Sequence, residues 1–266
     1  MDPLMIALIV AVFTLIILFS GIPIAFGLSF VSLVLLVSFE GFQMLEVFAE
    51  SYYGGIDSFV LLSIPMFIVM GMAVANSPAG KDLYTGLDRW LWRVPGGLVI
   101  SNIGACSIFA ALSGSSPATC AAIGTMGIPE MRKRGYSDQI ATGTIAAGGT
   151  LGVLIPPSIV LIVYGMATGT SIGRLFLCGI IPGFMLAGLF MAWALFHSYF
   201  IDKNSAAALR AKVKPTLKEK LEVIPRVAPF LAIVAGVLYV LYGGVATPSE
   251  ASGVGAFLVF VMIAVV

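Results

Sequence analysis

The sequence predicts an all-α polytopic membrane protein, and three observations carry that prediction. Of the 266 residues, 59% are hydrophobic and only 10% are charged, and the mean hydropathy is +1.07. A water-soluble domain could not cover its surface with so few polar residues. Several apolar runs reach the roughly 20 residues that a helix needs to cross a bilayer, whereas the alternating pattern of barrel strands is absent.

Charge and cysteine content exclude other classes. The 14 basic residues lie in short loops and form no stripe, so no nucleic-acid partner is expected. Cys106, Cys120 and Cys178 fall inside apolar segments without metal-ligand spacing, and we interpret them as buried apolar side chains. The N-terminus has no basic region ahead of its apolar run, so it is expected to be a first membrane helix instead of a secretory signal.

Residues 1 to 94 are predicted to form N-terminal membrane helices that act as a scaffold. Residues 4 to 37 are too long for one span, and Gly21-Ile22-Pro23 divides them into two. Residues 58 to 75 make a third span, which we expect Pro65 to interrupt. Residues 76 to 93 mix charges with Trp90 and Trp92, a composition typical of a helix that lies along the membrane surface.

Residues 95 to 200 are predicted to be a transport-type segment built around two interruptions. The apolar stretch 95 to 129 is split by the polar sequence SGSSP, and its second arm, 118 to 129, has 12 residues. That arm gives about 18 Å of helix, which is too short to cross a bilayer. A re-entrant hairpin with its tip near mid-membrane is therefore expected. Residues 140 to 167 form a helix broken by GGTLG and Pro156-Pro157, and 171 to 200 form the next span.

The C-terminal part is predicted to contain a cytoplasmic basic loop, residues 201 to 226, followed by further membrane helices in 227 to 266. Threading the spans in order puts all but one of the 14 basic residues, Arg174, on one face. Loops rich in Lys and Arg mark the cytoplasmic side. The apolar end at Val266 carries no polar cap, from which we expect a truncated product, a fragment or half of a split subunit.

The hairpin tip and the helix break are the candidate binding site. Backbone that is not helical at membrane depth costs several kcal/mol for each unpaired group, so it persists where it lines a cavity. The tip offers hydroxyl groups and the positive end of the returning helix. Its residues are Ser113, Ser115, Ser116 and Thr119, with Gly114 allowing close backbone approach and Pro117 fitting the first turn of that helix.

The break is expected to supply backbone carbonyls to the same site. Pro156 and Pro157 have no N–H, so carbonyls before them stay unpaired and suit a hard cation. Gly148, Gly149 and Gly152 are expected to allow unusual dihedral angles there. Neutral oxygens are sufficient for a Na⁺ site, and no ionisable residue lies at the centre of a span, so sodium coupling fits better than a proton relay.

Two other interpretations compete with a binding site. Small residues also mark close helix packing in membranes, and serines can bond back to their own helix. A catalytic serine is disfavoured, because the only histidine, His197, lies at the far end of another span. No enzyme activity and no cofactor beyond a coupling ion are expected. His197 itself is interpreted as an interfacial side chain.

Six motifs closely resemble the large membrane subunit of the tripartite ATP-independent periplasmic (TRAP) transporters, in order along essentially the whole chain. They are GIPIAF at 21, SIPMFIVMG at 63, SGSSPATCAAIG at 113, GTLGVLIPPSIVLIVYG at 149, SIGRLFLCGIIPG at 171 and TPSEASGVGA at 247. The hairpin and GTLGVLIPPS motifs are specific and not merely compositional. The chain resembles the N-terminal half of that subunit.

This resemblance implies one repeat of an inverted-repeat, elevator-type transporter in the bacterial inner membrane. It implies Na⁺-coupled import of an organic anion, such as a C4-dicarboxylate or sialic acid, delivered by a periplasmic binding protein, and a smaller membrane subunit as partner. Carried over by motif, Ser113 and Ser116 with the backbone of Gly152, Ile155 and Pro157 form a sodium site. Ser115, Thr119 and Thr150 are the candidates near the substrate.

The sequence departs from the family pattern, since members usually exceed 400 residues and carry two hairpins and two broken helices. Only the first of each is found here. A non-transporting scaffold or packing subunit, or an incomplete fragment, is therefore the alternative function.

Overall fold

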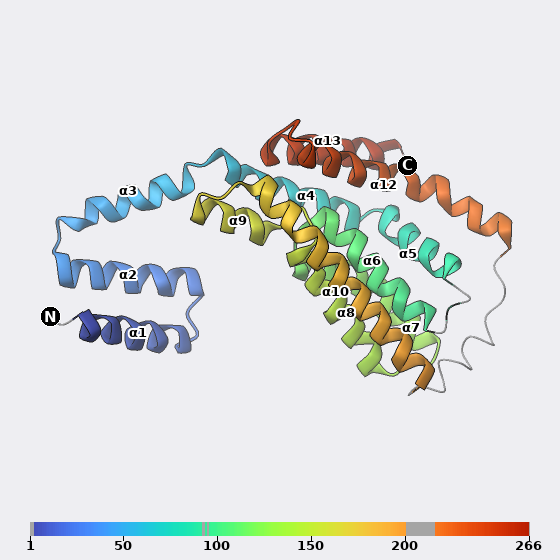
Figure 1. The fold of residues 1–266 in the computed structure, drawn as a ribbon, viewed down its shortest axis with the longest axis horizontal. Coiled ribbons are helices and arrows are strands. Elements are labelled where there is room, and N and C mark those ends of the chain that lie inside the picture. Colours follow the sequence, from blue (N-terminus) through green and yellow to red (C-terminus); the bar gives the residue numbers. More distant parts are fainter. Residues whose placement is uncertain (1–2, 92–93, 95, 201–215, 266) are drawn as a thin grey trace. The chain divides into compact units, whose positions relative to one another are not determined.

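The computed structural model describes residues 3 to 91, 94, 96 to 200 and 216 to 265, and every regular element in that part of the chain is a helix (Figure 1). The chain divides into two compact units, Met1–Ser58 and Phe59–Val266. Together with the apolar composition, the helices confirm the predicted all-α polytopic class. The predicted division into a scaffold, a transport-type segment and a C-terminal part stays a prediction.

The first unit contains three helices, α1 (Pro3–Phe19), α2 (Ile24–Glu40) and α3 (Met44–Ile56). The chain turns between α1 and α2 at Gly21, whose φ of +80° is readily accessible only to glycine. The first two helices pack on each other, with the rings of Phe13 and Phe30 6.4 Å apart, and Ser29 hydrogen-bonds Tyr52 of α3. The predicted division of residues 4 to 37 into two helices is therefore confirmed.

The second unit begins with a 3₁₀ turn, η1 (Phe59–Leu62), then α4 (Ser63–Ala75) and α5 (Pro78–Trp90). The predicted interruption at Pro65 is wrong. Pro65 lies in the first turn of α4, where the missing N–H would have had no partner within the helix. Helix α5 falls within the segment predicted to lie along the membrane surface and packs against α6 and α12.

The hairpin consists of α6 (Gly97–Ser113) and α7 (Ser116–Lys133), joined by a short turn. Helix α7 passes through Pro129 and has 18 residues, so the second arm is longer than the sequence predicts. The loss of one N–H at Pro129 falls near the polar end of the helix. The helical hairpin is present, whereas the depth of its tip in a membrane stays a prediction.

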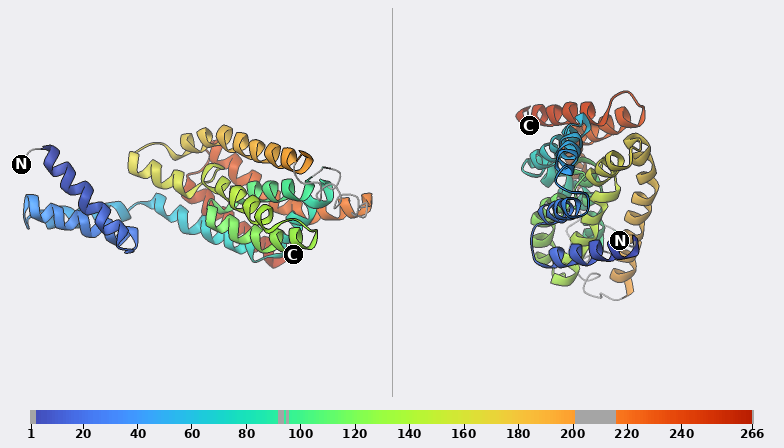
Figure 2. Two further views of the ribbon diagram at one scale, coloured as in Figure 1. Left: turned by 90° about the horizontal axis from the view of Figure 1, so that it is seen from below. Right: turned by 90° about the vertical axis from the view of Figure 1, so that its left-hand side faces the viewer.

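The broken helix consists of α8 (Asp138–Leu154) and α9 (Ile159–Thr168), followed by α10 (Ile172–Phe200). Helices α6, α7, α8 and α10 lie side by side in two views (Figures 1 and 2). The break is confined to residues 155 to 158. The expected unusual dihedral angles of Gly148, Gly149 and Gly152 are not observed, because all three belong to α8 and none has a positive φ.

The C-terminal helices are α12 (Leu217–Tyr242) and α13 (Pro248–Val265). The predicted basic loop of 201 to 226 falls in part outside the described residues, and 217 to 226 are helical. Glu219 explains the early start of α12, because its carboxylate accepts a hydrogen bond from the Thr216 N–H at 2.7 Å. Thr247 and Glu250 repeat this capping arrangement at α13.

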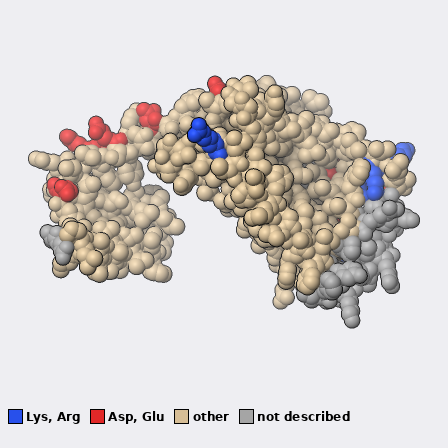
Figure 3. All heavy atoms as spheres, viewed as in Figure 1, with Lys and Arg blue, Asp and Glu red and all other residues tan. Residues whose placement is uncertain are grey.

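Four described segments are long and apolar enough to cross a membrane: Asp138–Thr168, Ile172–His197, Leu217–Tyr242 and Pro248–Val265. Helices α1, α2 and α6 are shorter apolar helices. The face of the second unit seen in Figure 3 is nearly free of charged side chains. Such a surface suits lipid and not water.

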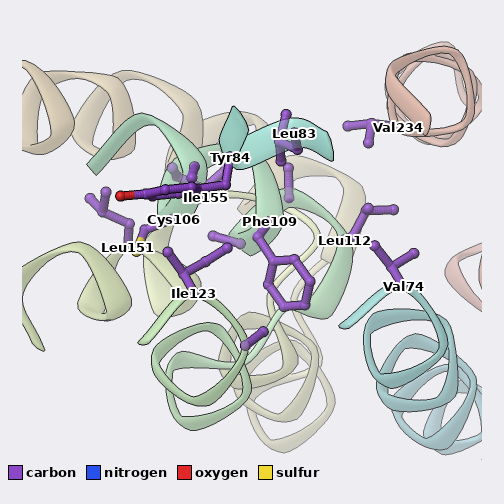
Figure 4. Packing of buried hydrophobic residues seen from close by; sticks show 14 of the residues in the cluster. Val74, Leu83, Tyr84, Cys106, Phe109, Leu112, Ile123, Leu151, Ile155 and Val234 are labelled. Atoms are coloured by element: carbon purple, nitrogen blue, oxygen red, sulfur yellow. The ribbon is translucent and has the colours of Figure 1, made fainter. Parts of the chain in front are cut away.

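The core of the second unit joins α4, α5, the hairpin and the broken helix. Figure 4 shows Phe109 and Leu112 of α6 and Ile123 of α7 converging toward the side chains of neighbouring helices. Those three side chains and Leu151 of α8 have no exposed surface. The hairpin is therefore packed on its neighbours along its whole length.

Charged side chains fix the base of the hairpin. Arg134, directly after α7, donates two hydrogen bonds to the Asp88 carboxylate of α5, at 3.1 and 2.9 Å, and also pairs with Glu130 at 2.7 Å. Burial lowers the pKa of Arg134, but the hydrogen bonds and charges of Asp88 and Glu130 outweigh burial and raise it overall. Helix α5 and the hairpin base are thus held together by a half-buried ion pair.

We expect Arg134→Gln to lower the free energy of unfolding by about 1 to 2 kcal/mol, because it removes the guanidinium that pairs with the partly buried Asp88. The measurement is thermal or denaturant unfolding in detergent. Arg132→Gln is the matched control, since Arg132 and its partner Asp138 are both exposed. Equal effects of the two substitutions would show that the Asp88 pair does not fix the hairpin base.

Candidate functional site

The hairpin tip packs directly against the break in the neighbouring helix. The N–H of Ile159 donates a hydrogen bond to the carbonyl of Gly114 at 3.0 Å. Gly114 has a φ of +58°, and a Cβ atom built on it would lie 2.6 Å from the carbonyl oxygen of Pro157. A glycine is therefore required here both for the turn and for the close approach of the two backbones.

The same contact brings oppositely polarised helix ends together. The C-terminus of α6 meets the N-terminus of α9 through the Gly114 hydrogen bond. The N-terminus of α7 meets the last turn of α8, since a Cβ atom on Gly152 would lie 2.8 Å from the Ser116 nitrogen. Exposed N–H groups carry partial positive charge and exposed carbonyls partial negative charge. The helix ends at the hairpin turn and those at the break therefore complement each other electrostatically.

Three glycines of α8 form the contact surface for the hairpin. A Cβ atom on Gly149 would lie 1.9 Å from the sulfur of Cys120, and one on Gly148 would lie 2.9 Å from Cys106. Gly152 faces the backbone of Ser115 and Ser116 within 2.9 Å. The GGTLG sequence, which predicts an unwound segment, is therefore helical, and its glycines let the hairpin pack closely against α8.

Two oxygen atoms at this contact, one of the backbone and one of a side chain, lack a hydrogen-bond partner that they would ordinarily have. The carbonyl of Gly152 would pair with the amide of residue 156, which is a proline and has no N–H. The Ser116 hydroxyl is buried and has no hydrogen-bond partner within the described part of the chain. A buried hydroxyl without a partner is costly and indicates a ligand or water.

The other tip hydroxyls already have protein partners. The hydroxyls of Ser113 and Thr119 lie 3.0 Å apart, and the Thr119 hydroxyl donates to the Ser115 carbonyl at 2.8 Å. Ser113 and Thr119 are fully buried, whereas Ser115 is half-buried. Pro117 occupies the first turn of α7, as predicted. These bonds hold the turn in one conformation.

Thr150 is separate from that network. It lies on α8 two residues before Gly152, it is exposed, and its hydroxyl donates to the Ala147 carbonyl at 2.7 Å. Ile155 and Pro157 lie in the break itself and are buried. The structure therefore brings the tip serines against Gly152 and close to Pro157, with Ile155 in the same break, and leaves Thr150 exposed.

Two residues of the site were not predicted from the sequence. Ser158 is fully buried, and its hydroxyl donates to the Val153 carbonyl at 2.6 Å, replacing the N–H that Pro157 lacks. A serine immediately before an apolar run is a helix N-cap pattern that could have indicated it. Gly71 of α4 lies against the other side of the tip, and a Cβ atom built on it would lie 2.7 Å from the Cα atom of Ser113.

Interrupted helices that meet within an apolar bundle are typical of one class, the helical membrane transporters, whose binding sites are commonly formed by discontinuous helices. A comparison with protein families makes this specific. The model of the tripartite ATP-independent periplasmic transporter, DctM component, matches residues 9 to 266. The chain belongs to this family, whose members are membrane permease subunits of the bacterial inner membrane and not enzymes.

Individual relatives agree with the family match. The C4-dicarboxylate TRAP transporter large permease protein DctM of Vibrio cholerae is 38% identical over 90% of this chain and 52% of its own length. The isethionate TRAP transporter permease protein DctMQ of Oleidesulfovibrio alaskensis is 37% identical over 89% of this chain and 36% of its own. The sialic acid TRAP transporter large permease protein SiaM of Vibrio cholerae is 32% identical over 90% of this chain and 54% of its own length. The chain thus spans about half the length of the Vibrio relatives.

We expect Gly152→Ala to destabilise the protein by about 1 to 3 kcal/mol, because the added methyl group overlaps the tip backbone. Gly143→Ala, in the same helix with open space around it, is the control and should be neutral or stabilising by up to about 1 kcal/mol. Unfolding in detergent measures both. Effects of the same sign and size would mean that the tip does not press on α8.

Proposed function

We propose that this chain contributes the sodium-binding half-site of a TRAP-type permease that imports an organic anion together with Na⁺. Its best support is the unpartnered Ser116 hydroxyl, buried beside the last turn of α8. Na⁺ is coordinated by neutral oxygens, which discontinuous helices commonly supply. The proposed ligands are the Ser113 and Ser116 hydroxyls with the carbonyls of Gly152, Ile155 and Pro157.

The substrate is proposed to bind near Ser115, Thr119 and Thr150. The N-terminus of α7 presents partial positive charge at Ser115 and Ser116, which favours an anionic group. The names of the relatives specify a C4-dicarboxylate, isethionate and sialic acid as their compounds. Thr119 is buried and bonded to the Ser115 carbonyl, so its direct contact with substrate requires the tip to rearrange.

The proposed partners are a small TRAP membrane subunit and a periplasmic substrate-binding protein. They follow from the tripartite family, and transport itself is proposed for the complete complex, since this chain spans about half of the Vibrio relatives.

Ser116→Ala should leave the free energy of unfolding in sodium-free buffer unchanged or raise it by up to about 1 to 3 kcal/mol, because it removes a buried hydroxyl that makes no hydrogen bond in the described structure. The same change should abolish stabilisation of the chain by Na⁺ measured against choline. Ser107→Ala is the control, since the Ser107 hydroxyl bonds only to its own helix at the Ile103 carbonyl. A sodium response that survives Ser116→Ala would sink the assignment.

The rival function is a scaffold whose small residues serve only helix packing. Its support is the tight contact of Gly152 and Gly71 with the tip, which close packing alone would also produce. A single cysteine at Ser115, in a background without the native cysteines, separates the two functions. If this is a binding site, Na⁺ and substrate should protect the cysteine from maleimide in the complete complex. If it is a packing surface, the cysteine should crosslink to a partner, and its labelling should not change with Na⁺ or substrate.

A further inference from the structure

Ser158 occupies the junction of three segments: the last turn of α8, the first turn of α9 and the hairpin turn. Its hydroxyl donates a hydrogen bond to the Val153 carbonyl at 2.6 Å and accepts one from the Leu161 N–H at 3.4 Å. The next residue, Ile159, donates its N–H to the Gly114 carbonyl at 3.0 Å. Ser158 has no exposed surface. One buried hydroxyl therefore connects both halves of the broken helix, directly beside the residue that holds the hairpin turn.

The two prolines of the break leave two consecutive carbonyls of α8 without their helical partners. The Gly152 carbonyl loses the N–H of residue 156, and the Val153 carbonyl loses that of residue 157. Ser158 supplies a donor to the second carbonyl and not to the first. An unpaired carbonyl in apolar surroundings is costly, so it attracts a donor or a cation. The hydroxyl therefore satisfies Val153 and leaves the Gly152 carbonyl for a ligand.

Gly152 is also the residue of this pair that packs on the hairpin tip. A Cβ atom built on it would lie 2.8 Å from the nitrogen of Ser116, whose own hydroxyl is buried without a partner in the described part of the chain. Val153 follows about 100° further around the helix and carries a half-buried side chain. The carbonyl that Ser158 leaves unpaired thus belongs to the residue in contact with the tip.

Capping of α9 alone does not require the bond to Val153. Ser137 caps α8 in the same way, since its hydroxyl accepts a hydrogen bond from the Ile140 N–H at 3.4 Å, the distance found for Ser158 and Leu161. Both serines have extended backbone conformations. Ser137 is exposed, and its hydroxyl donates no bond within the residues that the structure describes. The donated bond is what distinguishes Ser158 from an ordinary cap.

We propose that Ser158 is a positioning residue for the sodium site: by satisfying the Val153 carbonyl, it fixes the break and determines which backbone oxygens meet Na⁺. This inference rests on the proposed function and adds to it a residue that does not itself contact the ion. A site whose oxygens are already in place binds more tightly than one that must first be ordered, in proportion to the competent fraction of the chains.

Ser158→Ala should raise the apparent Kd of the full chain for Na⁺ by about tenfold, the ratio of affinities that corresponds to one hydrogen bond. The Kd is obtained from the increase in unfolding free energy across a Na⁺ titration in detergent, with choline keeping the ionic strength constant. Ser158→Thr keeps a capping hydroxyl and should hold the Kd within about twofold of the parent value. If Ser158→Thr shifts the Kd as much as Ser158→Ala does, the hydroxyl is not the cause and the inference fails.

Ser137→Ala is the matched control, because it removes a cap of the same geometry that donates nothing to the break. It should lower the melting temperature and leave the Kd for Na⁺ unchanged. Equal shifts of the Kd in the two alanine variants would overturn the positioning role. If Ser158→Ala does not fold, Ser158→Cys takes its place, since a thiol is a weak donor of similar size and should still raise the Kd.

Hydrogen exchange in sodium-free buffer reports the positioning without the ion. The amide of Ile159 should exchange about tenfold faster in Ser158→Ala than in the parent, and no faster in Ser137→Ala. An unchanged rate would overturn the inference.

Failure of this inference is distinguishable from failure of the sodium site. If Ser116→Ala abolishes stabilisation by Na⁺ while Ser158→Ala leaves the Kd unchanged, the role of Ser158 is wrong and the sodium site stands. If Na⁺ does not stabilise the parent chain, both the site and the role of Ser158 are wrong.

Discussion

The hydrogen bond from the Ile159 N–H to the Gly114 carbonyl joins two interrupted helices where neither can satisfy its own backbone. An apolar bundle surrounds this point, so every unpaired N–H or carbonyl carries a penalty of several kcal/mol. The hairpin turn and the break resolve that penalty for each other by placing opposite helix ends in contact. Ser158 completes the arrangement, because its hydroxyl donates a hydrogen bond to the Val153 carbonyl, for which Pro157 has no N–H.

Close packing makes this contact possible. The three glycines on one face of α8 and Gly71 of α4 place no side chain of their own between those helices and the hairpin. The hairpin is held at its other end by the ion pair of Arg134 with Asp88. A segment fixed at both ends keeps the few oxygens at its tip in defined positions, which is the condition for selective binding of a small ion.

The missing side-chain volume of two glycines in α8 has two different outcomes. At Gly152 the missing Cβ atom is filled by the tip backbone, so the space is closed. At Gly143 nothing fills it, and a cavity remains between α8 and α10. Sequence alone does not distinguish these glycines, which lie nine residues apart in the same helix. The difference depends on which helix each one faces.

The sequence by itself determined the class, the order of the helices, the turn between α6 and α7 and the broken helix. Apolar run length, Gly21-Ile22-Pro23 and Pro156-Pro157 act through the local backbone, and a local rule needs no neighbour. Only the tertiary structure decided that Gly148, Gly149 and Gly152 stay helical, that α7 continues past Pro129, and that Thr150 is exposed. Each of those outcomes depends on contacts with another helix. The packing energy of such contacts exceeds the local preferences that the sequence displays.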